Sequence, residues 1–402
     1  MSDVFFPPAG PLRGEVRAPP DKSISHRAAL FAAMSDGETR IANYLHAEDT
    51  TSTLNAVRAL GASVDVLSSG EVVVGGVGLA GARVPDGPID VGNAGTLMRL
   101  LPGWLAAQEG RAFSLDGDAS IRRRPVDRIA EPLERMGAVL EPTDGRYPPF
   151  VVRGSALSAI AYVLPVASAQ VKSCVLIAGL LAHGTTTVTE PQPSRDHTER
   201  MLAGAGVAVS RSGADVSLSR AQVLQAQSLR VPGDPSSSAF VVAAAVLVGG
   251  SRVLVRDVGV NWTRIGFLRI LERMGGCVDG ALEEVPVDGS ATPTTDPISD
   301  LDVSAGPLRA TTVDAAEVPL AIDELPLVAL LGCFAEGESV VRGAAELRLK
   351  ETDRIAGVVD GLRGLGASIE ATEDGFVVTG GRELRGGVID AHGDHRMAML
   401  GA

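Results

Sequence analysis

The 402-residue sequence predicts a mixed α/β (α+β) protein whose chain repeats one structural unit. Apolar runs of helical length alternate with short segments rich in β-branched residues, which is typical of this fold class. The combination recurs about every 70 residues, a longer period than that of common solenoid repeats. The composition is 45% hydrophobic but only 3% aromatic, with 47 glycines, so small residues are expected to bring helices close to sheets.

The first kind of repeated segment starts with a polar or Gly/Ser phrase, continues as an apolar helix, and ends in a glycine and a strand. Residues 231–258 are a clear example, in which the apolar run Ala239–Val248 is followed by two glycines and the strand Ser251–Val255. The same order of features predicts four equivalent segments, at residues 18–45, 90–117, 164–191 and 314–343.

The second kind of segment is an amphipathic helix that ends at a glycine and leads into a short hairpin. Glycine is the residue expected in the left-handed position after a helix. The alternation of apolar and polar residues in Ser368–Ala371 and Gly375–Val378 is typical of hairpin strands. The predicted helices and their glycines are Thr50–Leu60 with Gly61, Val126–Met136 with Gly137, His197–Leu202 with Gly204, Thr263–Met274 with Gly275, and Thr352–Leu365 with Gly366.

Five repeats are complete, and a sixth starts at Asp390 and is interrupted at Ala402 after about two helical turns. We therefore expect a segment to be missing after Ala402. Six repeats suggest two pseudo-symmetric lobes of three, with helices inside curved sheets. We predict one lobe at residues 18–230 and a discontinuous second lobe at 1–17 and 231–402, with the active site in the cleft between them.

Charge and hydropathy exclude several classes of partner. The formal net charge of −13 argues against nucleic acid or an anionic membrane as the main partner. Residues 1–8 have neither the basic nor the apolar region of a signal peptide. The longest apolar runs, Val175–Ala182 and Ala239–Val248, are shorter than the roughly 20 residues of a membrane span. These features predict a soluble, cytoplasmic protein.

The three cysteines are Cys174, Cys277 and Cys333. Three cysteines cannot all pair within the chain, and each lies in or beside apolar sequence. We therefore expect buried, reduced thiols of a cytosolic protein rather than disulfides or nucleophiles.

Positive charge is concentrated in four short phrases that precede apolar runs, which is where helices begin. Cations are unfavourable at a helix N-terminus, because the exposed N–H groups and the helix dipole are already positive there. Their repeated use predicts a site for a small, highly charged anion. For any single phrase, solvated surface arginines are an equally good interpretation. The phrases are Asp21–Arg27, Arg122–Pro125, Arg348–Arg354 and Gly393–Arg396.

Several polar residues in these and neighbouring phrases could contact a ligand. Lys22, Ser23 and Arg27 lie within two helical turns and could converge on one phosphate or carboxylate. Ser168 offers a hydroxyl to a phosphorylated ligand, although a helix N-cap explains it equally well. Gly95 lies in a tight helix entry where a ligand could touch backbone, or where a turn requires glycine.

Two acids are candidate proton carriers. Asp323 precedes an apolar helix, so it is either a capping residue or a general base. Glu351 follows Lys350 and is either a second proton carrier or a salt-bridged surface acid. His392 and His395 superficially resemble a metal-binding pair, but no third ligand cluster accompanies them, so we expect no metal. The absence of phosphate-loop and dinucleotide motifs predicts no nucleotide cofactor.

Taken in order, these phrases resemble the 3-phosphoshikimate 1-carboxyvinyltransferases, or EPSP synthases, over nearly the whole chain. Ser168–Lys172, Arg195–Glu199 and Asn261–Arg264 are similar to the bacterial class II subgroup, in which Ala169 replaces a serine common elsewhere. The matching stretches are Asp21–Arg27, Gly92–Arg99, Arg124–Pro125, Ser168–Lys172, Ser194–Glu199, Pro232–Ser237, Ile322–Pro326, Leu349–Arg354 and Asp394–Met399.

The resemblance implies two pseudo-threefold lobes of βαβαββ units, the inside-out α/β barrel of the enolpyruvyl transferases. It implies transfer of the enolpyruvyl (carboxyvinyl) group of phosphoenolpyruvate to the 5-hydroxyl of 3-phosphoshikimate, with release of phosphate, in the shikimate pathway to chorismate and aromatic amino acids. It also implies a monomer that needs no metal or organic cofactor.

The resemblance further implies the roles of individual residues. Asp323 is the expected base on the 5-hydroxyl, with Glu351 and Lys22 as candidates for the C3 proton. Gly95, which is often alanine in herbicide-tolerant members, predicts sensitivity to glyphosate. The expected 3-phosphoshikimate contacts are Lys22, Ser23, Arg27, Ser168, Ala169, Gln170, Ser194, Asp323, Glu346 and Lys350. The expected phosphoenolpyruvate contacts are Lys22, Gly95, Arg124, Gln170, Arg354 and Arg396.

Two alternatives remain open. Family members continue beyond the Asp394–Arg396 phrase into a lysine-bearing segment that touches phosphoenolpyruvate, so the chain could be a truncated, weakly active remnant that binds 3-phosphoshikimate. The UDP-N-acetylglucosamine enolpyruvyl transferases resemble the same fold, but they usually place a reactive cysteine, or in some members an aspartate, in a Gly-rich loop before Arg-Pro. The corresponding residues 117–125 contain no cysteine, which favours the shikimate type.

Overall fold

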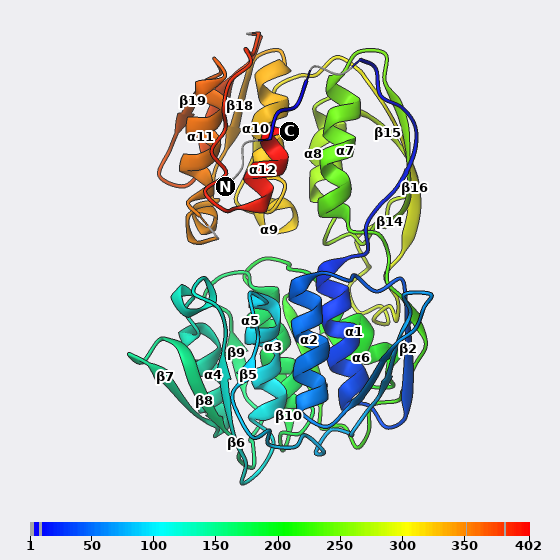
Figure 1. Ribbon diagram of the computed structural model, residues 1–402, viewed down its shortest axis with the longest axis vertical. Helices are drawn as coiled ribbons and strands as arrows, with labels where there is room; N and C mark the ends of the chain where they lie inside the picture. The colour runs from blue at the N-terminus through cyan, green and yellow to red at the C-terminus, as the bar shows by residue number, and fades with distance from the viewer. Residues whose placement is uncertain (1–3, 8–9, 351, 382) are drawn as a thin grey trace. The chain divides into compact units, whose positions relative to one another are not determined.

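The computed structural model describes residues 4–7, 10–350, 352–381 and 383–402, which are drawn in Figure 1. Its internal contacts divide the chain into two units. Unit 1 comprises Met1–Pro19, Gly233–Glu284 and Pro297–Ala402, and unit 2 comprises Pro20–Pro232 and Val285–Asp296.

The described residues form five four-stranded sheets, and all five share one internal order. In each sheet, a short first strand pairs in parallel with the strand that follows an apolar helix. That second strand pairs antiparallel with one strand of a hairpin, whose other strand forms the far edge. The predicted α/β class and its repetition are confirmed, as open sheets rather than a closed barrel among these residues.

Unit 2 contains three of the sheets. The first has the order β13 (Leu229–Arg230), β2 (Glu38–Ala42), β4 (Val72–Gly75) and β3 (Ser63–Val66). The second has the order β5 (Ile89–Asp90), β6 (Ala112–Asp116), β8 (Tyr147–Arg153) and β7 (Val139–Thr143). The third has the order β9 (Ala161–Val163), β10 (Thr185–Thr189), β12 (Asp215–Ser219) and β11 (Val209–Ser212).

The helices of unit 2 are of two kinds. Three are almost entirely buried, namely α1 (Lys22–Met34), α3 (Gly95–Leu105) and α5 (Ala169–Gly179). A helix that is apolar on all sides belongs in a core, and α3 and α5 pack directly against each other (Figure 1). The other helices are α2 (Glu48–Ala59), α4 (Asp127–Met136), α6 (His197–Gly204) and the 3₁₀ turn η1 (Ile121–Arg123).

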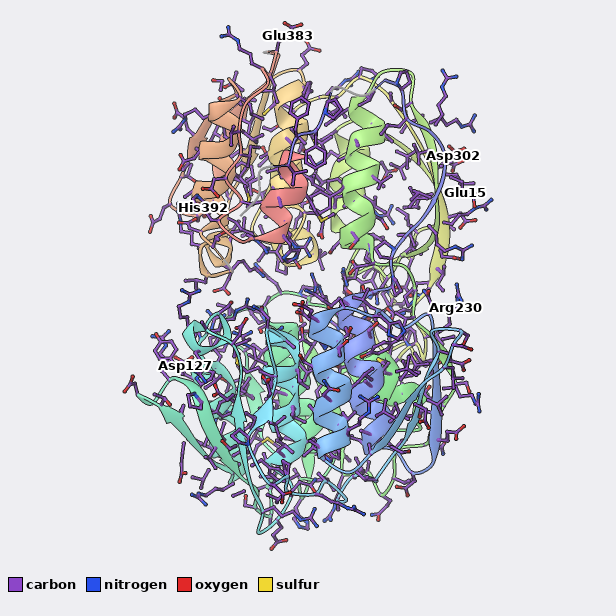
Figure 2. All side chains as sticks on the ribbon, viewed as in Figure 1. Glu15, Asp127, Arg230, Asp302, Glu383 and His392 are labelled. Atoms are coloured by element: carbon purple, nitrogen blue, oxygen red, sulfur yellow. The ribbon has the colours of Figure 1, made fainter. Side chains whose placement is uncertain are left out.

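Unit 1 contains the remaining two described sheets. The first has the order β1 (Arg13–Arg17), β14 (Arg252–Gly259), β16 (Ile298–Ser304) and β15 (Cys277–Asp279). The second has the order β17 (Thr312–Val313), β18 (Glu338–Val341), β20 (Phe376–Thr379) and β19 (Ser368–Ala371). The exposed faces carry ion pairs such as Glu15–Arg256 and Asp302–Arg252, and Figure 2 labels both acids.

The core of unit 1 is formed around α10 (Leu325–Phe334), which packs against α7 (Pro235–Leu247), α8 (Gly266–Arg273), α11 (Arg354–Gly364) and α12 (His395–Gly401). The remaining short helices are α9 (Val318–Ala321) and η2 (Ala345–Leu349). Among the residues that the structure describes, no helix has both the length and the apolar character needed to cross a membrane.

Two predicted helix boundaries are wrong for local reasons. The helix predicted from Thr263 begins at Gly266, because the Asn261 side chain accepts hydrogen bonds from the N–H and the hydroxyl of Thr263 and forms a turn there. Gly204 lies inside α6 rather than after it, and a Cβ at this position would lie 3.0 Å from the Thr294 oxygen. The left-handed residue after α6 is Gly206, with φ of +87°.

One cysteine prediction is also wrong. Cys174 and Cys333 are buried, whereas Cys277 is exposed because it lies on the edge strand β15. All three are free. Burial raises the pKa of Cys174 and raises that of Cys333 to about 11, so neither thiol is an effective nucleophile near neutral pH.

The buried His26 of α1 predicts a pH-dependent loss of stability. It is 2% exposed, its Nδ1 lies 2.6 Å from Thr53 Oγ1, and burial lowers its pKa to about 3. As the pH falls below the ordinary histidine value, only the unfolded chain takes up this proton, so the folded state loses up to about 1.4 kcal/mol per pH unit. Urea unfolding at pH 7 and pH 5 measures this, and the wild type should lose about 2 kcal/mol more than His26→Gln. Equal losses in both proteins would contradict the prediction.

Candidate functional site

In unit 2, the first turn of α3 forms a cluster with the first turn of α5. The Arg99 Nη1 donates a hydrogen bond to the Gln170 Oε1 at 3.2 Å and to the Gly95 carbonyl at 3.4 Å. The Gln170 Nε2 donates in turn to the Thr96 hydroxyl at 3.3 Å. The amide of Gln170 is therefore held in one orientation by residues of α3.

Arg124 extends this cluster from the segment after η1. Its Nη2 donates to Asn93 Oδ1 and to Ser120 Oγ, both at 3.2 Å. A Cβ built on Gly95 would lie only 2.8 Å from Arg124 Nη1, so the guanidinium lies directly over the glycine. The structure thus brings together Gly95, Arg124 and Gln170, three of the predicted phosphoenolpyruvate contacts. We refer to Gly95, Thr96, Arg99, Arg124 and Gln170 as the Gly95 cluster.

The start of α1 presents Lys22 and Ser23. The N-cap Asp21 accepts a hydrogen bond from the N–H of Ile24 at 2.8 Å, which fixes the first turn. The Lys22 Nζ lies 3.0 Å from the Asp49 Oδ2. Both residues of the ion pair are partly exposed, and Lys22 therefore stays accessible to an anion.

Arg27, a predicted ligand contact, lies deeper. It is 2% exposed, and its Nε and Nη2 donate to Thr198 Oγ1 at 2.8 Å and to Ser173 Oγ at 3.0 Å. Its Nη1 donates to the Ser23 carbonyl at 3.1 Å. Burial lowers the pKa of Arg27 to about 10, but it remains charged near neutral pH. Three of its donors therefore order α1, α5 and α6 from inside the unit.

Arg195, which is less buried than Arg27, also contacts the first turn of α1. Its Nη1 lies 3.4 Å from the Ser23 hydroxyl. Residue-level reasoning singled out neither Arg195 nor Thr198. The sequence indicated them only through the Arg195–Glu199 stretch, which resembles the class II subgroup.

Ser194, another predicted contact, is positioned by a buried charge cluster. The Glu190 Oε1 accepts hydrogen bonds from the Ser194 N–H at 3.1 Å and from its hydroxyl. The Lys172 Nζ lies 3.0 Å from this oxygen and 2.6 Å from Glu199 Oε1. Burial alone would lower the pKa of Lys172, but Glu199 and Glu190 outweigh it and raise the pKa. We refer to Lys172, Glu190 and Glu199 as the Lys172 cluster.

The remaining predicted residues of unit 2 lie at the start of α5. Ser168 is its N-cap, and its hydroxyl accepts a hydrogen bond from the Val171 N–H at 3.4 Å. Ala169 is the first residue of the helix. Both are partly exposed and adjoin Gln170 of the Gly95 cluster.

In unit 1, three cations surround the carboxylate of Asp323. The Arg354 Nη1 lies 3.3 Å from the Asp323 Oδ1, and the Lys350 Nζ lies 3.7 Å from the same oxygen. The Arg396 Nη2 lies 3.6 Å from the Asp323 Oδ2. These cations come from the end of η2 and from the first turns of α11 and α12, so the fold brings four predicted site residues together.

Asp394 fixes two of these cations. Its carboxylate accepts hydrogen bonds from Arg354 Nε at 2.8 Å and Nη2 at 3.4 Å, and it caps α12 by accepting from the Arg396 N–H at 2.9 Å. Burial alone would raise the pKa of Asp394, but its hydrogen bond and charge interaction with Arg354 lower it. Arg354 itself is 1% exposed, so this pairing compensates for its burial.

Glu324 is a further acid beside Asp323, and sequence reasoning did not identify it. It is 4% exposed, and its Oε1 lies 3.8 Å from the Arg396 Nη1. The Arg264 Nη2 donates to Ser236 Oγ at 2.9 Å and to Asp234 Oδ1 at 3.2 Å nearby. The only sequence signal for Glu324 was its position next to Asp323.

The two other predicted acids are less informative. Glu346 is half-buried in η2. Glu351 lies outside the described residues.

The possible metal ligands have other partners. Asp394, in the His392–His395 phrase, is bonded to Arg354, and His392 is exposed on the turn before α12 (Figure 2). A second group comprises Asp196, His197 and Asp296. Asp196 accepts a hydrogen bond from Arg200, and His197 is paired with Asp296, so an acidic group of this kind needs no ion.

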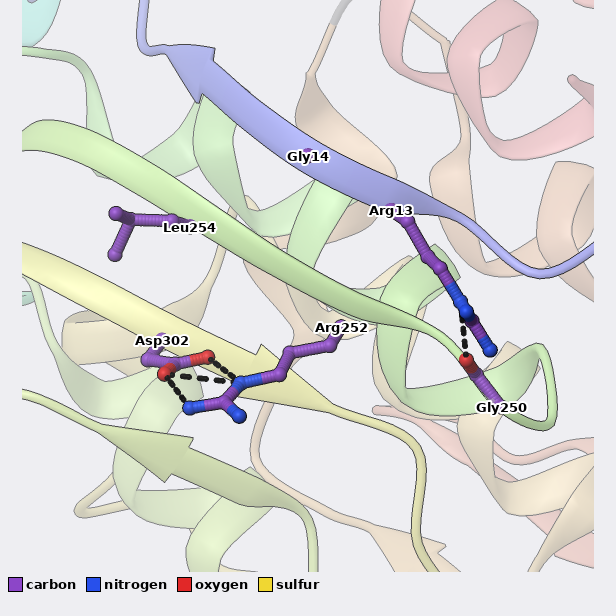
Figure 3. Close-up of a pocket in the computed structure, with 6 residues that line it drawn as sticks. All are labelled: Arg13, Gly14, Gly250, Arg252, Leu254 and Asp302. Atoms are coloured by element: carbon purple, nitrogen blue, oxygen red, sulfur yellow. Dashed lines mark hydrogen bonds and ion pairs between the residues drawn. The ribbon is translucent and has the colours of Figure 1, made fainter.

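A surface hollow of about 560 Å³ in unit 1 is lined by none of the predicted site residues. Figure 3 shows that its polar groups are engaged with each other, because Arg252 binds Asp302 and Arg13 donates to the Gly250 carbonyl. The hollow is on the outer face of a sheet in unit 1, and its two arginines, Arg13 and Arg252, already have hydrogen-bond acceptors. The candidate site residues are therefore those of the Gly95 cluster, the start of α1, and the residues around Asp323.

Comparisons with known proteins agree on one family. The family model described as EPSP synthase (3-phosphoshikimate 1-carboxyvinyltransferase) matches residues 7–402. A 3-phosphoshikimate 1-carboxyvinyltransferase of Alkalilimnicola ehrlichii is 47% identical over 393 residues, covering 98% of this chain and 86% of the relative. The enzyme of the same name from Bacillus subtilis is 45% identical over 393 residues, covering 97% and 89%.

A solved structure leads to the same assignment. EPSP synthase from Acinetobacter baumannii has a TM-score of 0.85 and 41% identity, and the match covers 98% of this chain and 89% of that structure. At this level of identity and coverage, sequence and fold agree along nearly the whole chain. The chain belongs to the EPSP synthase (3-phosphoshikimate 1-carboxyvinyltransferase) family of transferases.

Proposed function

We propose that this protein transfers the carboxyvinyl group of phosphoenolpyruvate to the 5-hydroxyl of 3-phosphoshikimate and releases phosphate. The observation that carries the proposal is the carboxylate of Asp323 among three cations, Lys350, Arg354 and Arg396. Such an arrangement combines an acceptor for the hydroxyl proton with the positive charge that two anionic substrates require. The names of the relatives support the choice of substrates.

The reaction has an addition step and an elimination step. The 5-hydroxyl oxygen forms a bond to C2 of phosphoenolpyruvate, its proton passes to Asp323, and C3 gains a proton. The C2–O bond to phosphate then breaks and C3 loses a proton, which restores the double bond. We assign the C3 proton to Lys22 or Glu351. No metal or organic cofactor is part of this proposal.

The remaining predicted residues bind and orient the two anions. We assign the phosphoenolpyruvate anion to Gly95, Arg124 and Gln170, together with Lys22, Arg354 and Arg396. We assign 3-phosphoshikimate to Lys22, Ser23, Ser168, Ala169, Gln170, Ser194, Asp323, Glu346 and Lys350, with Arg27 as a further contact. Fixed cations that hold two mutually repulsive anions lower the barrier by orientation and by charge compensation.

The decisive experiment is phosphate release with both substrates present. We expect release only when phosphoenolpyruvate and 3-phosphoshikimate are supplied together, with a product whose mass equals their sum minus phosphoric acid. Calorimetric binding of 3-phosphoshikimate without turnover would favour the weakly active alternative. Turnover with UDP-N-acetylglucosamine instead of 3-phosphoshikimate would overturn the substrate assignment.

The proposal extends to the setting of the enzyme. We propose a cytoplasmic monomer that acts on small molecules and binds neither nucleic acid nor membrane. The net charge of −13 and the three free cysteines support this setting. Light scattering of the purified protein tests the oligomeric state.

Gly95→Ala tests the contribution of the Gly95 cluster. The added Cβ would meet Arg124 Nη1 at 2.8 Å, so the guanidinium must move away from its partners Asn93 and Ser120. We expect the KM for phosphoenolpyruvate to rise about tenfold, equivalent to about 1.4 kcal/mol of binding free energy, with a smaller change for 3-phosphoshikimate. Steady-state kinetics with each substrate varied measures this, and sensitivity to glyphosate should fall in parallel. Gly364→Ala is the control for a general effect of replacing a helical glycine, because Gly364 lies in α11, its φ is not left-handed and no atom lies within 4 Å of the added Cβ.

A further inference from the structure

Glu324 and Asp323 compete for one guanidinium. The Arg396 Nη2 lies 3.6 Å from Asp323 Oδ2, and the Arg396 Nη1 lies 3.8 Å from Glu324 Oε1. Neither distance is a hydrogen bond, and the Nη1 donates instead to the backbone carbonyl of Asp323 at 3.3 Å. Arg396 is therefore held between two adjacent carboxylates without being committed to either one.

The surroundings of Glu324 make this competition consequential. Its side chain is 4% exposed, and among the described residues its Oε1 has no hydrogen-bond partner. Burial raises the pKa of Glu324, and the charge of Asp323 adds to this. Arg396, Arg264 and a hydrogen bond from Ser236 act in the opposite direction. The positive charge of Arg396 thus favours the charged form of Glu324. The negative charge of Glu324 in turn helps to hold the Arg396 guanidinium in its position between the two carboxylates.

Asp323 already has strong positive neighbours apart from Arg396. Lys350 and Arg354 lie 3.7 Å and 3.3 Å from its Oδ1. A carboxylate that is stabilised by too many cations becomes a poor proton acceptor. A nearby negative charge that draws one cation away keeps such a carboxylate basic.

We propose that Glu324 is a positioning residue that shares Arg396 with Asp323 and thereby keeps the Asp323 carboxylate basic enough to accept the substrate proton. The inference rests on the proposed function, in which Asp323 is the base. It assigns Glu324 no contact with substrate. Its effect is exerted through Arg396 and through the charge that Glu324 places beside Asp323.

Glu324→Gln removes the charge and keeps the shape. In this variant Asp323 is the one of the two side chains that still carries a negative charge, so the charge of Arg396 acts on Asp323 alone. The Asp323 carboxylate therefore becomes a weaker base. We expect kcat to fall on the order of tenfold and the acid limb of the kcat–pH profile to move about one unit to lower pH. The KM for 3-phosphoshikimate should change little. Glu324→Asp, which retains the charge, should return the acid limb toward its wild-type position.

Two further variants make the kinetic test specific. Glu317→Gln is the matched control, since Glu317 also precedes a helix of unit 1 and pairs with an arginine, Arg273, at 2.8 Å. It should leave both kcat and the pH profile unchanged. Ser236→Ala removes one hydroxyl that favours charged Glu324, so it should shift the acid limb in the same direction as Glu324→Gln but less. Ser236→Ala keeps the test available if Glu324→Gln does not fold.

A titration of Asp323 separates this inference from the proposed function. Aspartate labelled with ¹³C at the carboxyl carbon reports its protonation by NMR, and Asp323→Asn identifies the signal. We expect Asp323 to titrate at lower pH in Glu324→Gln than in the wild type, whether or not the protein turns over. Failure of wild-type turnover would overturn the function alone. Identical Asp323 titrations and identical pH profiles in wild type and Glu324→Gln would overturn the role of Glu324.

Discussion

Asp323→Ala should reduce kcat by about 10²–10⁴-fold, the range that a general base typically contributes. Its substrate affinities should stay the same or improve, because removal of the carboxylate leaves Lys350, Arg354 and Arg396 with more positive charge for the anionic ligands. This separation of kcat from affinity is the signature of an interaction made in the transition state. Steady-state kinetics and calorimetry on the same preparation measure both quantities.

The control for this variant is Asp302→Ala in the same unit. Asp302 is partly exposed on β16 and is paired with Arg252, which is not a predicted site residue. It should leave kcat and both KM values unchanged. Asp323→Ala turnover within a factor of about five of the wild type would show that Asp323 is not the base, because loss of a general base costs far more.

Lys172→Met should cause the largest loss of stability. Lys172 is fully buried and lies 3.0 Å from Glu190 and 2.6 Å from Glu199, so methionine removes the nearest cation of two buried carboxyl groups, of which Glu190 keeps Arg211 at 3.6 Å. Breaking a buried ion pair by removing one partner costs about 3–5 kcal/mol. Urea unfolding at pH 8 should show a loss of this size, with the midpoint shifted and the m-value unchanged.

The pH dependence of this loss provides a second check. Burial and the proximity of Glu190 raise the pKa of Glu199, although Lys172 opposes them. A carboxyl whose folded pKa lies above its unfolded value stabilises the folded state at low pH, and this contribution disappears as the pH rises. The destabilisation by Lys172→Met should therefore be smaller at pH 5 than at pH 8. The double variant with Glu199→Gln should recover part of the loss, and a double variant less stable than Lys172→Met would contradict the explanation.

Local chemistry explains which features of the fold were predictable. The start of α1 was predictable from the Asp21–Arg27 phrase, because the short acidic side chain of Asp21 before an apolar run can bond to an N–H group of the first turn. Asp353 caps α11 in the same way, although the predicted helix began at Thr352. Gly137 is recognisable as a helix end for a similar reason, and its φ is +108°. The rule that a glycine marks a helix end failed at Gly204, because this glycine lies within α6 and permits close packing there.

The clustering around Asp323 was predictable only as a list of residues. The positions of Lys350, Arg354 and Arg396 at helix starts indicated an anion site. Their spacing in the sequence, however, did not indicate how close they lie to Asp323 in the fold. The role of Glu324 was hidden because an acid before a helix is ordinarily an N-terminal cap. Its burial beside Arg396 is a product of the packing of α12 against α10.

The burial of Arg27 and Lys172 is a feature that the sequence did not predict. Both lie at helix starts, and Arg27 was a predicted ligand contact, whereas Lys172 was part only of the Ser168–Lys172 stretch that carries the family resemblance. The structure buries them against Thr198 and Glu199, which lie far away in sequence. A sequence pattern indicates which residues can be charged, but the pairing that makes a buried charge tolerable depends on which helices pack together.

The shared strand order has a consequence for biosynthesis on the ribosome. The two middle sheets of unit 2 are built from contiguous stretches, residues 89–153 and 161–219, so each can close soon after its last strand emerges. The sheet of β2 must wait for Arg230, whose strand pairs with residues 41–42, and β1 must wait for β14 at residues 252–256. Nascent chains should therefore pair β2 with β4 early but complete that sheet only when β13 emerges, whereas β1, the first strand made, gains its parallel partner only after β14 is synthesised.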